Sequence, residues 1–261
     1  MKSIIYYFSG TGNNLAIAKR LADELGDTTI LPISSLLQNK AIPEEYGWVG
    51  FTAPSYYSHV PPYVEACMKD VVYAEKQKVF LIAGCGGNRG LAIQDMRKQV
   101  HNSNKEVSLE YMVILPGNYI TSYNALPMWY QKFTTRLSYR KIHQIAQDIK
   151  QDRKRKSLRE GFFYNKKYEE ELQKVIGDYG QMGRQFTIND DCTLCGACLK
   201  VCPTKNITIN DGKVIHGDTC NLCMGCIQWC PCKAVDYQGK AKDRNRYHHL
   251  DISKQEFFHN S

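Results

Sequence analysis

The chain has 261 residues, of which 43% are hydrophobic, and it carries a formal net charge of +8. This length suits one large or two modest domains, and the composition is ordinary for a globular protein. No apolar run in the sequence approaches the roughly 18 residues of a membrane span, and the apolar stretch at residues 4–8 is too short for a signal peptide. We therefore expect a cytoplasmic protein with no membrane span.

The start of the chain predicts a strand, a glycine-rich loop and a helix. Residues 1–8 are a short run of β-branched and aromatic side chains, typical of a buried strand. Apolar side chains then recur at helical spacing over residues 15–25, and Gly26 ends the pattern. The loop between them consists of Ser9, Gly10, Thr11, Gly12, Asn13 and Asn14. Such a loop gathers backbone N–H groups and the positive helix end onto an anion, although an ordinary tight turn has similar glycines.

Further strands alternate with helices along the first half of the chain. Strands are expected at residues 28–33, 48–53, 79–83 and 109–115, and helices at residues 61–71 and 90–100. This alternation predicts an α/β fold with a doubly wound, five-stranded parallel sheet and helices on both faces. Ligands of such sheets bind outside the carboxyl ends of the strands.

The glycine-rich loop resembles the phosphate loop of the flavodoxins. That family's pattern, Ser/Thr-x-Thr-Gly-Asn-Thr/Ser, is matched from Ser9 to Asn13, and Asn14 departs from it. The resemblance implies a flavodoxin-like, FMN-binding domain at residues 1–150, with the phosphate held by this loop. It also implies that two strand-end loops hold the flavin ring, and that Tyr56 or Tyr57 stacks on it. These loops are Pro54, Ser55, Tyr56, Tyr57 and Ser58, and Gly84, Cys85, Gly86 and Gly87.

An aromatic segment and a basic helix follow the last predicted strand. The aromatic segment covers residues 116–130, and an amphipathic helix is expected over residues 131–159. Its charged run at residues 150–156 is expected to be a solvated helix end. We assign residues 151–185 to a helical connector, which includes a further helix near residues 169–176.

Two segments of the C-terminal part share the spacing Cys-x2-Cys-x2-Cys-x3-Cys-Pro. They are Cys192, Cys195, Cys198 and Cys202, and Cys220, Cys223, Cys226 and Cys230. They belong to an internal repeat that aligns residues 192–209 with residues 220–237 and pairs Leu194 with Leu222. Disulfides would suit a secreted protein, and zinc would use two CxxC pairs and leave four thiols idle. The spacing therefore favours iron–sulfur clusters, whose irons take soft thiolate ligands.

This spacing resembles that of the bacterial two-4Fe-4S ferredoxins, over about residues 190–238. In that family the fourth cysteine of each half ligates the cluster of the other half. The resemblance implies an α+β ferredoxin-like domain at residues 186–238 with two ligand sets. Set I is Cys192, Cys195, Cys198 and Cys230, and set II is Cys220, Cys223, Cys226 and Cys202. Cys232 lies outside both sets, and Asn210-Asp211-Gly212 predicts a hairpin between the two halves.

The whole chain resembles the flavodoxin–ferredoxin fusion proteins of anaerobes, followed here by a tail at residues 239–261. In those fusions a similar Asn-Tyr segment follows the last strand, so Asn118 and Tyr119 are candidates for contact with the flavin or the ferredoxin domain. A packed connection into the next helix would explain them equally well. We expect His59 to be a turn residue rather than a base, and the tail residues His248 and His249 to be solvated.

The resemblance implies FMN and two 4Fe-4S clusters as cofactors. With about −2 for each of the three groups, the net charge of the loaded protein falls to about +2, so the basic composition is weak evidence for nucleic acid. We expect an electron-transfer protein that serves a redox partner protein and passes low-potential electrons between the clusters and FMN. The alternative is an FMN-dependent reductase of a small substrate. A homodimer, in which one chain serves the flavin of the other, stays open.

Overall fold

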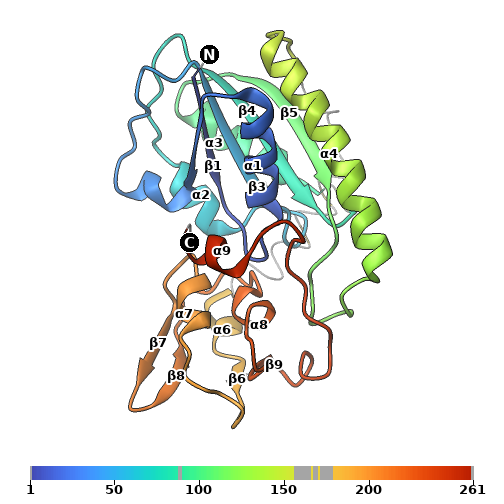
Figure 1. Cartoon of the computed structure of the whole chain (residues 1–261). Helices are drawn as coiled ribbons and strands as arrows, with labels where there is room; N and C mark the ends of the chain where they lie inside the picture. The colour runs from blue at the N-terminus through green and yellow to red at the C-terminus, as the bar shows by residue number, and fades with distance from the viewer. Residues whose placement is uncertain (1, 88–89, 156–165, 167–169, 171–178, 260–261) are drawn as a thin grey trace.

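The computed structural model describes residues 2–87, 90–155, 166, 170 and 179–259 (Figure 1). The helix expected near residues 169–176, and most of the connector around it, lie outside the described residues. The N-terminal part and the C-terminal part form two bodies joined by an extensive contact, and the tail returns from the second body to the first.

The N-terminal part is built on a five-stranded parallel sheet in the order β2-β1-β3-β4-β5. The strands are β1 (Ser3–Tyr7), β2 (Thr28–Pro32), β3 (Trp48–Pro54), β4 (Lys78–Cys85) and β5 (Val107–Ile114). This is the flavodoxin strand order, in which the direction of the winding reverses between β1 and β3. The predicted doubly wound α/β fold is confirmed, and its ligand crevice is expected where β1 and β3 end.

Helices cover both faces of the sheet because the strands are apolar on both sides. Along β1, Ile5 and Tyr7 enter the core under α1 (Asn13–Leu25) and α4 (Met128–Lys150). Ile4 and Tyr6 point the other way, as strand geometry requires. They enter the core under η1 (Ile33–Leu37), α2 (Pro62–Met68) and α3 (Ala92–Asn102).

Helix α4 ends at Lys150, so the prediction of a helix to residue 159 was wrong. Asp152 takes a left-handed φ of 52°, and the chain then turns back to the edge strand β5. There the Arg155 N–H donates to the Ser108 carbonyl at 3.0 Å. Residues 150–155 are exposed, as predicted for the solvated basic run, and within it Arg153 pairs with Asp148 at 3.1 Å and Arg155 lies over the Tyr111 ring. Backbone pairing with the open sheet edge replaces further helical turns.

The C-terminal part contains two small antiparallel sheets and three short helices. Its elements are α6 (Tyr179–Gly183), β6 (Phe186–Ile188), α7 (Ala197–Val201), β7 (Ile207–Asn210), β8 (Lys213–His216), α8 (Gly225–Gln228) and β9 (Val235–Tyr237). The predicted hairpin is β7–β8, with left-handed φ values at Asp211 (49°) and Gly212 (70°), as its two-residue turn requires.

The internal repeat of the sequence is also a structural repeat. Strand β6 pairs with β9 as β8 pairs with β7. Ile188 faces Val235 in the first pair, and His216 faces Ile207 in the second. His216 comes 28 positions after Ile188, and Val235 comes 28 positions after Ile207. The same offset separates Cys192 from Cys220 (220 − 192). The two halves of the C-terminal part are therefore equivalent by a pseudo-twofold relation, and any difference between equivalent positions is informative.

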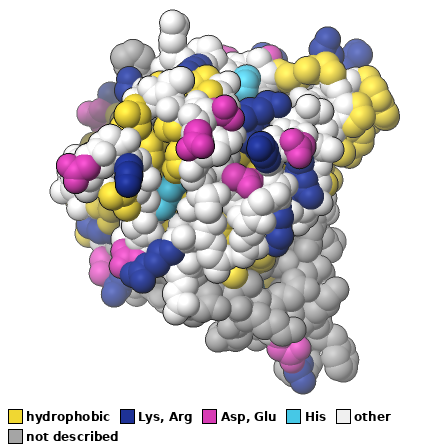
Figure 2. All heavy atoms as spheres, turned by 90° about the horizontal axis from the view of Figure 1, so that it is seen from below, with side chains coloured by type: hydrophobic (Ala, Val, Ile, Leu, Met, Phe, Trp, Pro, Cys, Tyr) yellow, Lys and Arg dark blue, Asp and Glu magenta, His cyan; other side chains and the backbone are white. Residues whose placement is uncertain are grey.

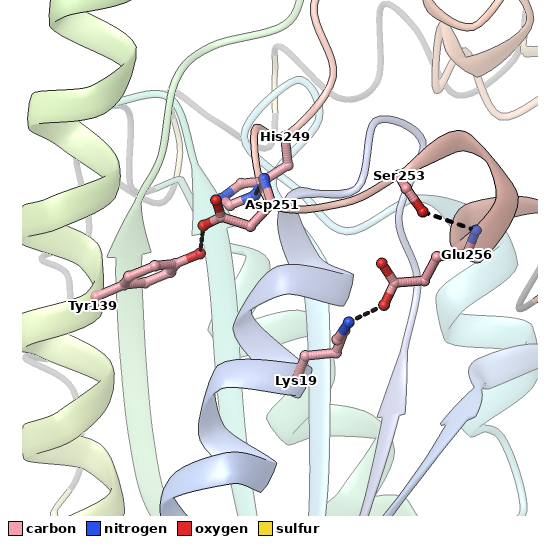
Figure 3. Close-up of polar contacts among 6 residues, drawn as sticks. All are labelled: Lys19, Tyr139, His249, Asp251, Ser253 and Glu256. Atoms are coloured by element: carbon pink, nitrogen blue, oxygen red, sulfur yellow. Dashed lines mark hydrogen bonds and ion pairs between the residues drawn. The ribbon is translucent and has the colours of Figure 1, made fainter.

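The tail packs against the N-terminal part and ends in α9 (Lys254–His259). Ile252 and Phe257 are buried in the core beneath α1. Figure 3 shows ion pairing of Lys19 with Glu256 and the hydrogen bond that Tyr139 donates to Asp251.

The prediction of a solvated His249 was wrong. Its side chain is fully buried beside Tyr139, with 6.2 Å between the ring centroids. The backbone N–H of His249 donates to the Thr11 carbonyl at 2.9 Å. The tail is thus a strap that ties the C-terminal part to the loop after β1. None of the described helices is both long enough and apolar enough to cross a membrane.

Candidate cofactor sites

The loop between β1 and α1 is built to receive an anion. Gly12 takes a left-handed φ of 91° just before α1, and in this fully described helix the first turn has no acidic residue and no side-chain cap. The Asn14 N–H donates to Ser9 Oγ at 3.3 Å, and the rest of the helix end can offer backbone N–H groups to a ligand. Thr11 is buried, and its Oγ1 accepts a hydrogen bond from the Asn118 amide. The Thr11 hydroxyl proton is then left to point at the ligand.

Asn14, which departs from the flavodoxin pattern, connects the loop to the ends of β3 and β4. Its Oδ1 accepts a hydrogen bond from Thr52 Oγ1 at 2.9 Å. The same oxygen lies 2.6 Å from where a Cβ on Gly84 would be. Gly84 is therefore required by the Asn14 side chain rather than by close approach of a ligand. From α1, the Asn14 amide therefore contacts both β3 and β4. The shorter hydroxyl side chain of Thr or Ser would reach these strands less well.

The three predicted loops meet at a cavity of about 340 Å³. Its lining comprises Ser9, Gly10, Thr11, Asn13, Asn14, Pro54, Ser55, Tyr56, Gly84, Cys85, Gly86, Pro116, Gly117 and Asn118. A second cavity, of about 700 Å³, shares Tyr56 and Gly86 with the first and extends past Tyr57, Tyr119 and Tyr123. Its far wall is Leu222, Cys223 and Met224 of the C-terminal part. We call the two cavities together the interdomain recess.

Three of the predicted site residues, Gly12, Ser58 and Gly87, do not line the recess. The space beside Gly12 is taken by Ile252 and His249 of the tail, at 3.2 and 3.3 Å from a hypothetical Cβ. The Ser58 carbonyl accepts a hydrogen bond from the Leu91 N–H, and Gly87 has open space beside it. These residues shape the loops, and their neighbours provide the surface of the recess.

Tyrosines form the aromatic wall of the recess. The Tyr57 and Tyr119 hydroxyls are hydrogen-bonded at 2.7 Å, and the two rings meet edge to face. Tyr57 also contacts Tyr179, with 6.2 Å between the ring centroids. Burial raises the pKa of Tyr56 well above its usual range, with smaller contributions from Cys223 and Tyr179. The Tyr56 phenol is therefore neutral at physiological pH. Tyr119 contacts Tyr57 of the loop after β3 and also packs against the core of the C-terminal part.

His59 lies outside the recess. Its Nδ1 is hydrogen-bonded to Asp95 on α3 at 2.9 Å, and the same carboxylate oxygen accepts the Val60 N–H at 3.1 Å. The buried pair holds the loop after β3 against α3. This position is that of a structural turn residue.

The fold groups the cysteines across the two halves of the repeat. Burial raises the pKa of Cys198 to about 11, and its thiol neighbours in the structure are Cys230 and Cys192. Burial likewise raises the pKa of Cys220 to about 11, with Cys202 as its thiol neighbour. In each group the fourth cysteine comes from the other half of the repeat. Cys232 lies beside set I, with its Sγ 3.8 Å from that of Cys230.

A cavity of about 340 Å³ is lined by all four set II cysteines, together with Phe186, Asn206 and His216. Among the described residues, no three His, Cys, Asp or Glu side chains are arranged to hold a single metal ion. Four thiols that line one cavity suit a cube of four irons, each of which takes one soft thiolate. The donor set therefore fits an iron–sulfur cluster.

The two halves of the repeat differ in their exposure. Leu194, beside set I, is 44% exposed, and Cys195 is exposed as well. Leu222, at the equivalent place beside set II, is 3% exposed and lines the interdomain recess. The N-terminal part therefore covers one of two equivalent faces, and the other faces solvent.

The loop that contains Cys223 of set II rests directly on the loop between β1 and α1 (residues 9–14). We call this second loop the candidate anion-binding loop, or anion-binding loop for short. A Cβ on Gly10 would lie 2.4 Å from the Cys223 carbonyl oxygen. The Trp229 indole N–H donates to the Gly10 carbonyl at 3.1 Å, and the Gln228 amide donates to the Asn118 carbonyl at 2.9 Å. Backbone therefore meets backbone at Gly10 and Cys223, and the Trp229 and Gln228 side chains hold the two parts together beside this contact.

Residues 185–231 match the 4Fe-4S dicluster domain family. The match contains every cysteine of sets I and II, and we call this part of the chain the dicluster domain. Because it covers less than half of the chain, it identifies this domain and not the whole protein. No curated protein matches the sequence.

Solved flavodoxins are similar in structure to a part of this chain. An archaeal flavodoxin is 14% identical, covers 57% of this chain and 99% of its own, and gives a TM-score of 0.35. The Megasphaera elsdenii flavodoxin is 16% identical, with coverages of 55% and 97% and a TM-score of 0.36. The flavodoxin of Streptococcus pneumoniae TIGR4 is 13% identical, with coverages of 57% and 97% and a TM-score of 0.39. At TM-scores below 0.5 these likenesses carry no weight beside the chain's own strand order.

Replacing Gly10 with Ala should loosen the seating of the dicluster domain on the loop after β1. The added methyl group would meet the Cys223 carbonyl, and overpacking of this kind costs about 1–3 kcal/mol. Amide hydrogen exchange should rise over residues 220–228. Gly50→Ala is the matched control, because its methyl group would meet Phe80 inside the N-terminal core. Exchange in G10A that stays at the wild-type level over residues 220–228 would contradict the contact.

Proposed function

We propose that the chain is an electron-transfer flavo-iron-sulfur protein. It holds two 4Fe-4S clusters in cysteine sets I and II and FMN in the interdomain recess, and it passes low-potential electrons between them. The observation that carries this proposal is the position of Cys223. This set II cysteine lines the same recess as Tyr56 and Tyr57, and its carbonyl contacts Gly10 of the anion-binding loop.

The residues present fit FMN. The N–H groups at the start of α1 and the Ser9 and Thr11 hydroxyls would hold the phosphate, since they lie at the helix end that borders the recess. Tyr56 and Tyr57 would hold the ring, with Asn118 fixing the Thr11 hydroxyl in place. FMN supplies a centre that accepts one or two electrons. The Leu222 and Met224 side chains would exclude water from the ring on the dicluster side.

The cysteine sets fit two clusters, one near the flavin and one at the surface. Set II is beside the recess, and backbone N–H groups donate to its sulfurs: Asn206 to Cys202 and Leu222 to Cys220, each at 3.3 Å. Set I includes the exposed Cys195 and would exchange electrons with a partner redox protein. Exposed clusters are oxygen-sensitive as a class, which is consistent with an anaerobic cytoplasm.

The alternative, an FMN-dependent reductase, is less well supported by the recess. Among the described residues that line it, none is Asp, Glu, His, Lys or Arg. The acids available there are phenols and the thiols of Cys85 and Cys223, and burial raises the pKa of Tyr56, Tyr57 and Cys223. The carboxyl, imidazole and amine groups that commonly transfer protons in enzymes are missing from this described lining.

A nucleic-acid role is not favoured either. On the described part of the face in Figure 2, which views the molecule from the dicluster end, acidic and basic side chains are interspersed. Nucleic-acid binding needs a basic patch that can follow the phosphates. In the basic run, Arg153 and Arg155 are already engaged with Asp148 and Tyr111.

Iron and sulfide analysis tests the clusters. Anaerobically prepared protein should contain about eight iron atoms per chain, the content of two 4Fe-4S clusters. Cys198→Ala should lose or convert one cluster and destabilise the dicluster domain, because a domain this small depends on its clusters to fold. Cys232→Ser is the control and should keep the full iron content. Zinc in place of iron, or about four irons in the reconstituted wild type, would rule out the assignment.

Flavin binding tests the anion-binding loop. Thr11→Ala should weaken FMN binding by roughly 1–3 kcal/mol, since a buried charged oxygen loses one donor. Fluorescence titration of the apoprotein measures this change, and Thr187→Ala on the exposed side of β6 serves as the control variant. Riboflavin lacks the phosphate and should bind more weakly than FMN. Equal affinity for the two would show that the loop does not hold a phosphate.

Rapid-mixing absorbance tests the transfer of electrons within one chain. After a low-potential donor reduces the clusters, FMN should be reduced at a rate that is independent of protein concentration. The reason is that covalent fusion fixes the effective concentration, on the order of millimolar for short linkers. A rate that falls on dilution would instead indicate a homodimer in which one chain serves the other. Fully reduced clusters beside FMN that stays oxidised, at potentials that favour its reduction, would refute the function.

A further inference from the structure

His216 lines the set II cavity and has a buried nitrogen atom that no other described residue hydrogen-bonds. It stands at the end of β8 and lines the cavity together with Cys202, Cys220 and Cys226. Its Nε2 is buried, and this atom has no hydrogen-bond partner among the described residues. A buried nitrogen without a partner is costly, so such atoms usually face a group that supplies the missing bond.

The imidazole ring is held in one orientation by its surroundings. It stacks on Phe186 with 4.8 Å between the ring centroids and 12° between the planes. Phe186 comes from β6 and is itself fixed against Tyr237 of β9, at 4.9 Å. The backbone of His216 is fixed as well, because it pairs with Ile207 in the β7–β8 hairpin. A ring clamped in this way can direct an N–H group at a fixed point.

The internal repeat provides a built-in comparison for this position. The residue that precedes His216 by the repeat offset of 28 (220 − 192) is Ile188. The two positions are equivalent in the fold, since Ile188 faces Val235 as His216 faces Ile207. Set I therefore has an apolar side chain where set II has a nitrogen donor. The histidine is not a requirement of the ferredoxin-like fold as such.

We propose that His216 donates an Nε2–H hydrogen bond to a sulfur atom of the set II cluster and thereby raises its reduction potential above that of the set I cluster. This inference rests on the two-cluster assignment of the proposed function. A donor to cluster or cysteine sulfur stabilises the extra negative charge of the reduced form more than the oxidised form. Ile188 offers no such donor, so the set I cluster keeps the lower potential.

The consequence is a direction for the electron within the dicluster domain. Set I faces solvent through Cys195, whereas set II lies against the interdomain recess through Cys223. With the higher potential at set II, an electron that arrives from outside resides preferentially on the flavin side. His216 is thus a positioning residue for charge, with no contact to the recess itself.

A redox titration of the full chain, followed anaerobically by electron paramagnetic resonance, tests the proposal. The wild type should show two separate cluster midpoints. His216→Ile, which copies the set I side, should lower the higher midpoint and leave the lower one in place. A tenfold loss in the ratio of reduced to oxidised set II cluster at fixed potential corresponds to a shift of about 59 mV for a one-electron couple. His216→Gln retains an N–H donor and should keep the midpoint closer to that of the wild type.

The reciprocal variant keeps the test independent of any folding defect in the first one. Ile188→His introduces the donor beside set I and should raise the lower midpoint. Iron content is measured on each sample, so a loss of clusters, which would count against the proposed function, is separated from a failure of the inference. Unchanged midpoints in both H216I and I188H at full iron content would overturn the role of His216.

Discussion

The structure depends on one close contact, between Gly10 of the anion-binding loop and the backbone of Cys223. There is no room for a side chain at this point, because a Cβ on Gly10 would lie 2.4 Å from the Cys223 carbonyl oxygen. The contact brings the loop of one domain and the cysteine loop of the other to van der Waals distance. Everything that makes the recess a shared site, including its wall of Leu222 and Met224, follows from this approach.

The same contact explains why the two halves of the dicluster domain are no longer alike. An internal repeat begins with two equivalent faces, and here Leu222 is buried in the interface while Leu194 remains exposed. Once one face is buried against the N-terminal part, the residues around the two faces can become different. The histidine at position 216 and the isoleucine at position 188 are such a divergence. His216 lines the cavity of the set II cysteines, and Ile188 lines a cavity with Cys192 of set I, to which His216 also contributes.

Local patterns in the sequence were sufficient to predict the parallel sheet, the hairpin and the presence of a ferredoxin-like domain. Each depends on residues that are near neighbours in the chain, such as the apolar run of β4 or Asp211-Gly212 in the turn. The end of α4 and the burial of His249 could not be predicted, because both are decided by distant partners: Ser108 in the first case, Thr11 and Tyr139 in the second. The role of Asn14 was hidden for the same reason, since Thr52 and Gly84 define it.

The strap formed by the tail has a consequence for how the protein is made. Lys19 and Glu256, which pair across the strap, are 237 residues apart in the chain. The side of α1 that receives Ile252 and Phe257 therefore stays uncovered on the ribosome until residues 252–257 have been translated. During that interval the N-terminal domain carries an open apolar groove beside its anion-binding loop. Nascent chains that stall before residue 252 would expose this groove to chaperones and proteases, which gives quality control a means to recognise incomplete molecules.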